Sequence, residues 1–146
     1  MSGGLKSLLK SGLMLWVVWL GACAYHADKG TMYQQLGEKQ GITGVVDKLL
    51  VLIARDELLN KRFVDVDIPI FREHLIEQLC QVADGPCEYT GGTMSEVHRG
   101  LNISDAEFNR LVTHLREAMT QQQIPYVTQN RLLSTLAPMH SEVTYQ

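Results

Sequence analysis

Two histidines, His74 and His98, are the side chains best suited to bind a transition metal. A neutral imidazole nitrogen is the commonest metal ligand among protein side chains. His98 lies in the short stretch 94–100, directly after a glycine-containing loop at 88–92. Each histidine also has an ordinary structural role open to it. His98 can donate a hydrogen bond to a backbone carbonyl, and His74 can lie half-exposed at the edge of a helix face.

Cys80 and Cys87 are seven residues apart, across the end of a predicted helix and the loop that follows. In an oxidising compartment they can form a disulfide. Two free thiols are an equally open alternative, because the sequence does not give the geometry that a disulfide requires. No Cys-x-x-Cys pair and no cluster of His and Cys indicates a zinc site.

The first 23 residues have the anatomy of a secretory signal. Lys6 and Lys10 precede the apolar block 13–20 (LMLWVVWL), which is short for a bilayer span, and Leu20-Gly-Ala-Cys23 closes it. This ending resembles the lipobox of bacterial lipoproteins, which implies cleavage before Cys23 and acyl chains on that cysteine. Two or more buried chains give stable anchoring. An uncleaved N-terminal anchor helix is the alternative reading.

This interpretation divides the chain into a signal peptide at 1–22, a tether at 23–30 and a globular domain at 31–146. With 146 residues, the chain is long enough for one domain with a substantial core. Cleavage leaves 11 basic and 16 acidic residues, a net charge of −5. No basic run exceeds Lys61-Arg62, so nucleic-acid binding is not expected. Ala24 does not resemble an inner-membrane retention signal, and we therefore expect a lipid-anchored protein on the periplasmic face of the outer membrane.

Apolar residues recur with helical spacing, and no stretch shows the two-residue alternation of a strand. We expect a helix from Thr31 that Gly37 interrupts, a second helix after Gly41 that fades at 56–60, and a third with Pro69 in its first turn. Two capping boxes, at 93–96 and 104–107, predict the starts of a short helix carrying His98 and of a long amphipathic helix. The inward face of the second helix is predicted to consist of Ile42, Val45, Val46, Leu49, Leu50 and Ile53. That of the third helix is predicted to consist of Phe71, Leu75, Leu79 and Val82. That of the long amphipathic helix is predicted to consist of Phe108, Leu111, Val112, Leu115 and Met119.

After Pro125 a final helix is predicted to carry Val127, Leu132, Leu136 and Val143 inward, with a bend near Pro138. The chain is therefore expected to be all-α.

The order of these elements resembles that of the group 1 truncated hemoglobins. The resemblance extends over residues 31 to 144, and the spacing between motifs is kept. It rests on Thr31-Met-Tyr-Gln-Gln-Leu-Gly37, Gly41-Ile42, Val45-Val46-Asp47, Phe63, Gly85-Pro86, Tyr89-Thr90-Gly91, the 94–100 stretch, Gly100-Leu-Asn-Ile-Ser-Asp105, His114-Leu115 and Leu136-Ala-Pro138. Asp84 departs from the family pattern, because it replaces the first of two glycines usual before the loop.

The resemblance implies a shortened globin in which two helices pack over two others around heme b. It makes His98 the proximal ligand of the heme iron. It also implies that Phe63 stacks on the heme. Met94, Phe108 and Leu115 are expected to line or support the proximal side.

On the distal side, Leu50 stands where family members that bind oxygen tightly often have a tyrosine. Leu75 replaces a frequent glutamine, and Phe71 is apolar as well. A bound diatomic gas would lose one or two hydrogen bonds, each contributing roughly 0.5–1.5 kcal/mol, so fast oxygen release is expected. His74 is the remaining polar group. It is expected to be a sixth, internal iron ligand, and the alternative is an outward contact to a heme propionate.

Three functions fit this resemblance. The first is a globin that reversibly binds oxygen or nitric oxide. The second is a bis-histidine heme protein for electron transfer or for redox or gas sensing, with an unidentified redox partner. The third is nitric oxide dioxygenation, which needs a reductase that this chain does not contain. No hydrolytic constellation competes, because no Ser or Cys has a sequence-visible base.

Overall fold

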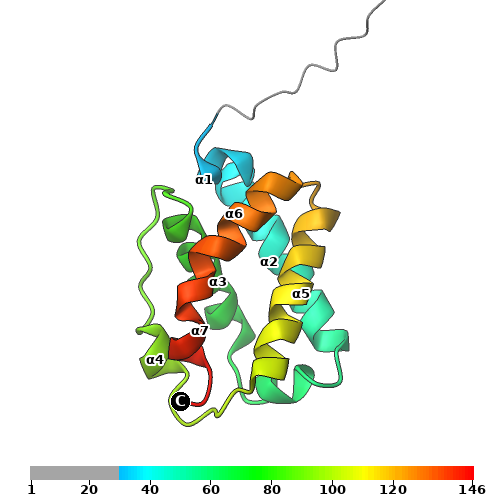
Figure 1. The fold of residues 1–146 in the computed structure, drawn as a ribbon, viewed down its shortest axis with the longest axis vertical. Helices are drawn as coiled ribbons and strands as arrows, with labels where there is room; N and C mark the ends of the chain where they lie inside the picture. The colour runs from blue at the N-terminus through cyan, green and yellow to red at the C-terminus, as the bar shows by residue number, and fades with distance from the viewer. Residues whose placement is uncertain (1–29) are drawn as a thin grey trace, which may run out of the picture.

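A computed structural model describes residues 30–146 of the chain (Figure 1). The predicted signal peptide, Cys23 and all but the last residue of the tether lie outside these described residues. The elements, in order, are α1 (Met32–Gln35), α2 (Glu38–Arg55), the 3-10 helix η1 (Asn60–Phe63), α3 (Ile68–Val82), α4 (Met94–Val97), α5 (Asp105–Gln121), α6 (Tyr126–Leu136), the 3-10 helix η2 (Ala137–Met139) and α7 (His140–Val143).

The four longest helices form two packed pairs, α2 with α3 and α5 with α6, and this two-over-two arrangement confirms the predicted all-α fold. α2 also contacts α5, and α6 contacts α3, which closes the core between the pairs. Figure 1 shows the chain returning from α6 to α7, which lies beside the short α4. In the described part, the only strand-like pairing is an isolated bridge between Ile103 and Thr144. No helix within it is long and apolar enough to span a bilayer.

The second helix begins earlier than predicted, at Glu38 rather than after Gly41. Gly37 adopts a left-handed φ of +80° at its N-cap, a conformation that glycine takes without steric cost. A Cβ at Gly41 would collide with the carbonyl of Leu36. Gly41 therefore permits a close approach inside the helix and does not end it. The predicted apolar face is correct, since Ile42, Val45, Val46, Leu49 and Ile53 are buried.

The predicted inward position of Val127 is wrong, because its side chain is 67% exposed. Thr128, four residues before Leu132, occupies the inner face of α6 instead. Its hydroxyl donates to Oε1 of Gln35 at 3.1 Å, which satisfies a polar group that is 1% exposed. The bend expected near Pro138 is present, as the 3-10 turn η2.

An ion pair ties the corner carrying Phe63 to the start of α5. Arg62 donates from Nε and Nη2 to the two carboxylate oxygens of Glu107, at 2.6 and 3.0 Å. Its Nη1 donates to the carbonyl of Leu101 at 2.9 Å. Glu107 also accepts from the backbone N–H and the hydroxyl of Ser104, completing the predicted capping box. These bonds fix η1 against the segment that follows His98.

Glu107 should make folding stability dependent on pH in the acid range. The Arg62 guanidinium, followed by the Ser104 donors, lowers the pKa of Glu107 from 4.5 to about 2. Its contribution is present above the unfolded pKa and is lost as pH falls from about 5 toward 2. We expect Glu107→Gln to remove about 2 kcal/mol of unfolding free energy at pH 7 and much less at pH 2.5, measured by urea unfolding. Glu57→Gln, at an exposed position, is the control; equal losses at both pH values for Glu107→Gln would contradict the account.

Candidate functional site

His98 is held at the end of a single helical turn. Thr93 caps α4 by accepting from the backbone N–H of Glu96, and the Glu96 carboxylate accepts from the Thr93 N–H at 2.9 Å and hydroxyl at 2.8 Å. The predicted capping box is therefore present. Gly100, with φ +80°, turns the chain away from the helix.

A short hydrogen bond orients the imidazole ring of His98. Its Nδ1 lies 2.7 Å from the carbonyl oxygen of Met94. A carbonyl oxygen can only accept, so Nδ1 carries a proton, and in the neutral imidazole the lone pair is then on Nε2. Among the described residues Nε2 has no hydrogen-bond partner. This is the arrangement in which a backbone carbonyl fixes the tautomer and ring direction of a metal-binding histidine.

One face of α3 carries the other predicted site residues. Ile76, Leu79 and Cys80 are buried in the core that α3 shares with α2. The side chains at positions 71, 74, 75, 78 and 82 share a different face and are only half-buried: Phe71, His74, Leu75, Gln78 and Val82. Apart from His74 and Gln78, this half-buried face of α3 is apolar.

The predicted apolar pocket residues lie around the same region. Phe63 and Phe71 meet edge to face, with ring centroids 5.1 Å apart. Leu50, Phe63 and Leu75 are half-buried and pack against the buried core. Phe108, also half-buried, meets the His140 ring at 4.6 Å. The Phe63–Phe71 pair joins η1 to α3, and none of these apolar side chains carries a hydrogen-bond donor.

Met94 links the helix of His98 to α3. Gln78 Nε2 lies 3.1 Å from the sulfur of Met94 and 3.6 Å from that of Met139. A cavity of about 250 Å³ lies between α3, α4 and α7, and Gln78, Val82, Met94 and Met139 contribute to its lining. Met94 is the one predicted pocket residue at this cavity.

His74 lies beside the loop that joins α3 to α4. Its ring meets that of Tyr89 edge to face at a centroid distance of 6.0 Å. Within the described residues neither ring nitrogen of His74 forms a hydrogen bond, and no contact joins His74 to His98. Burial, and to a lesser extent the Glu77 charge, raises the pKa of Tyr89, whose hydroxyl donates to the Gly92 carbonyl at 2.9 Å. The imidazole nitrogens of His74 are thus available to a ligand or to solvent.

The loop at 83–93 is fastened to α3 by a disulfide between Cys80 and Cys87, with 5.8 Å between their Cα atoms. The sequence left two possibilities open, a disulfide or two free thiols, and the structure shows the disulfide. Asp84, which replaces a family glycine, takes a left-handed φ of +59°. The loop thus keeps a backbone turn that glycine favours. Gly85 N–H donates to the Cys80 carbonyl at 2.8 Å, and a Cβ on Gly85 would collide with Tyr33 and Cys80.

Polar contacts fasten the same loop further along. The Tyr89 N–H donates to Oε1 of Gln81 at 2.7 Å. The N–H and hydroxyl of Thr90 donate to one carboxylate oxygen of Glu77, at 3.0 and 2.8 Å, and these two bonds lower the pKa of Glu77. The loop that leads into α4 is therefore held against the C-terminal part of α3.

This set of residues fits a flat, apolar group with a metal at its centre. Within the described residues no three His, Cys, Asp or Glu side chains could together hold a metal ion. A heme iron needs only one or two protein ligands, because the porphyrin supplies the others. Nε2 of His98, which has no hydrogen-bond partner among the described residues, could be such a ligand, and the half-buried face of α3 could be covered by a porphyrin.

Sequence reasoning missed two residues that position the site, Arg62 and Gln78. Gln78 could have been found, because it lies four residues after His74 on the same helix face. Arg62 carries no such pattern, since its partner Glu107 is 45 residues away.

Comparison with known proteins gives one consistent result. The sequence profile described as bacterial-like globin matches residues 31–145. The group 1 truncated hemoglobin GlbN of Nostoc sp. is 39% identical over 89 residues, which cover 61% of this chain and 75% of that protein. The GlbN of Mycolicibacterium paratuberculosis is 27% identical over 117 residues, covering 80% of this chain and 86% of that protein.

Solved structures show the same fold. The truncated hemoglobin of Tetrahymena pyriformis in its Fe(III) form superimposes with a TM-score of 0.77 at 19% identity, covering 80% of this chain and all (100%) of that one. The 2/2 hemoglobin of Synechococcus sp., solved in the cyanomet state with covalently attached heme, gives 0.73 at 17% identity, covering 78% and 98%.

Proposed function

The chain belongs to the bacterial-like globin family, and we propose that it is a truncated hemoglobin that binds heme b and reversibly binds a diatomic gas, oxygen or nitric oxide. His98 is the proximal ligand in this proposal. The observation that carries it is the 2.7 Å hydrogen bond from His98 Nδ1 to the Met94 carbonyl. It fixes the orientation of the ring and, in the neutral imidazole, places the lone pair on the opposite nitrogen, Nε2.

The surrounding side chains set the conditions for binding. Heme, when bound, supplies an iron that can take up a gas or exchange an electron. Leu50, Phe71 and Leu75 exclude water from the distal side and offer no hydrogen-bond donor to an incoming gas. Phe63 would pack against the edge or face of the porphyrin, and Met94 would support the proximal side. Oxygen would be released fast, because none of these side chains donates a hydrogen bond, which would contribute roughly 0.5–1.5 kcal/mol.

We propose His74 as the distal ligand of the iron. Its support is local: the ring lies on the half-buried face of α3 and has both nitrogens free of hydrogen bonds within the described chain. The competing role is a contact to a heme propionate, favoured by the position of the ring beside Tyr89 near the loop. Coordination is preferred because the apolar neighbours Leu50, Phe71 and Leu75 give the iron no other distal partner.

The second candidate function is electron transfer or redox sensing by a bis-histidine heme. The lack of a distal donor for a bound gas is the feature that favours it. Nitric oxide dioxygenation at the same site would need electrons from a reductase.

Removal of the proximal imidazole tests heme binding. We expect His98→Ala to transfer its heme to a heme-accepting protein more than about tenfold faster than the wild type, since even loss of an outer hydrogen bond reduces metal affinity roughly 10–100-fold. The rate is read from the change in Soret absorption. Lys48→Ala, which removes an exposed side chain on α2, is the control and should keep its heme. Normal retention by His98→Ala would overturn the assignment.

Removal of the distal imidazole tests coordination by His74. We expect the ferric and ferrous wild-type protein to show the sharp bands of a low-spin, six-coordinate heme, and His74→Leu to lose them. An unchanged spectrum in His74→Leu would exclude His74 as a ligand and favour the propionate contact. Carbon monoxide added to the ferrous wild type separates the two functions: complete displacement of His74 supports gas binding, and persistent bis-histidine bands support electron transfer.

We propose from the sequence that the domain is tethered to the periplasmic face of the outer membrane through an acylated Cys23. A radiolabelled fatty acid supplied to the expressing bacterium should label the wild-type protein. Cys23→Ala should lose both the label and the association with membranes. A membrane-bound Cys23→Ala protein would favour an uncleaved N-terminal anchor helix.

A further inference from the structure

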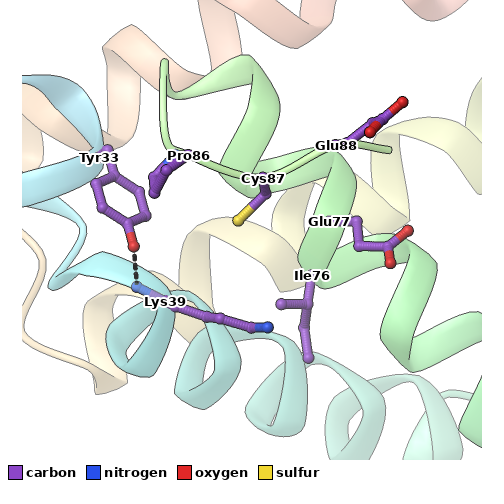
Figure 2. A pocket seen from close by; sticks show the side chains of 7 residues that line it. All are labelled: Tyr33, Lys39, Ile76, Glu77, Pro86, Cys87 and Glu88. Carbon is purple, nitrogen blue, oxygen red and sulfur yellow. Dashed lines mark hydrogen bonds between the residues drawn. The ribbon is translucent and has the colours of Figure 1, made fainter. Parts of the chain in front are cut away.

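A second cavity, of about 220 Å³, lies between the start of α2, α3 and the loop at 83–93, on the side of the disulfide. Figure 2 shows Cys87 among the residues that line the cavity, with its sulfur directed toward the space between them. Tyr33 closes one side of the cavity and Ile76 another. Lys39, Glu77 and Glu88 supply the charged groups.

The two sulfurs of the disulfide differ in access. Cys80 is 0% exposed and belongs to the core cluster. Cys87 is half-buried and lines the cavity. Thiol–disulfide exchange proceeds by attack of a thiolate on one sulfur while the other leaves, so access decides which sulfur is attacked. Cys87 is therefore the more accessible of the two residues to an external thiolate.

We infer that the Cys80–Cys87 disulfide is an exchange site that a dithiol reductant opens by attack on Cys87 through this cavity. In the first step the attacking thiolate forms a bond to Cys87 Sγ. The Cys80–Cys87 bond breaks, and Cys80 Sγ leaves with the electron pair and takes up a proton. In the second step the other thiolate of the reductant attacks its own sulfur in the mixed disulfide, and Cys87 leaves and is protonated. The protein disulfide gains two electrons and two protons, and the reductant becomes a disulfide.

The charges around the cavity indicate which reductant fits. The lining includes two residues with carboxylates, Glu77 and Glu88, and one with a cation, Lys39, so the residues around the cavity carry a net negative charge. Glu77 is held in place by Thr90, whose hydroxyl donates to it at 2.8 Å. A thiol next to positive charge is therefore favoured over an anionic one, and this preference should weaken with salt. The partner class is a dithiol oxidoreductase with basic residues around its reactive cysteine.

Opening the disulfide loosens the loop that precedes His98. Gly85 and the left-handed Asp84 fold the loop tightly over Cys80 while the bond is intact. After reduction the loop depends on the polar contacts of Tyr89 and Thr90 with α3. Since Tyr89 meets the ring of His74, the reduced protein should hold His74 less firmly. This last consequence rests on the proposed heme function, whereas the exchange chemistry does not.

Site selectivity tests the chemistry directly on the full-length, heme-loaded protein. The protein is treated briefly with excess cysteamine and quenched with an alkylating reagent, and fragment-ion mass spectrometry locates both groups. We expect cysteamine on Cys87 and the alkyl group on Cys80. Cysteamine mainly on Cys80, or exchange no faster than global unfolding as measured by amide hydrogen exchange, would overturn the inference.

The charge preference is tested with a second thiol. We expect cysteamine to react severalfold faster than 2-mercaptoethanesulfonate at low salt, when both rates are compared at equal thiolate concentration. Glu88→Gln should reduce that ratio by about twofold or more, because it removes one of the two carboxylates. Asp65→Asn makes the same charge change at an exposed site away from this cavity and should leave the ratio unchanged. Equal rates for the two thiols would contradict the proposed partner class.

Two readouts separate this inference from the proposed function. Amide exchange at Tyr89 and Thr90 should rise in the reduced protein, and unchanged exchange would show that the bond does not restrain the loop. The heme absorption spectrum should shift toward less His74 coordination. Attack at Cys87 without a spectral shift would overturn only the coupling to heme, and a protein that fails to bind heme would overturn the proposed function while leaving the exchange site intact.

Discussion

The hydrogen bond between His98 Nδ1 and the Met94 carbonyl is the constraint on which the site depends. It lies inside one turn of helix, which could not be stable in isolation. The turn persists because Thr93 and Glu96 cap its start, Gly100 ends it in a left-handed conformation, and α7 packs beside it. The His98 ring, which would otherwise rotate freely, is thereby held with Nδ1 on the Met94 carbonyl and Nε2 without a partner among the described residues. Heme binding in this account follows from that local geometry and from the apolar surface of α3.

Two interactions restrain the segments on either side of His98, the Arg62–Glu107 ion pair and the Cys80–Cys87 disulfide. The Arg62–Glu107 pair joins the corner carrying Phe63 to α5, and Arg62 also reaches the Leu101 carbonyl just beyond His98. The Cys80–Cys87 disulfide joins the loop before His98 to the end of α3. The ion pair is electrostatic and weakens in acid, because Glu107 must be ionised. The disulfide is covalent and is broken only by reduction. The segment that carries His98 is therefore restrained on one side by an ion pair and on the other by a covalent bond.

Local patterns in the sequence predicted most of the fold and only part of the site. The capping boxes at Thr93 and Ser104 and the proline in the first turn of α3 act within four residues, and all were read correctly. The start of α2 was predicted too late, because the close approach of Gly41 to the Leu36 carbonyl inside the helix is visible only in the folded chain. Val127 was placed inward because apolar residues are usually buried, whereas Thr128 satisfies its hydroxyl on Gln35. The Arg62–Glu107 contact and the pairing of Cys80 with Cys87 required the tertiary structure.

The most direct test of the central claim is the iron–histidine stretching band in the resonance Raman spectrum of the ferrous protein. The measurement is made in the His74→Leu background, so that the proximal bond is observed alone. The account predicts that the band is present, that adding His98→Gly abolishes it, and that added imidazole restores it by occupying the space of the missing side chain. A band that persists after His98→Gly without imidazole would contradict the assignment of His98 as the proximal ligand.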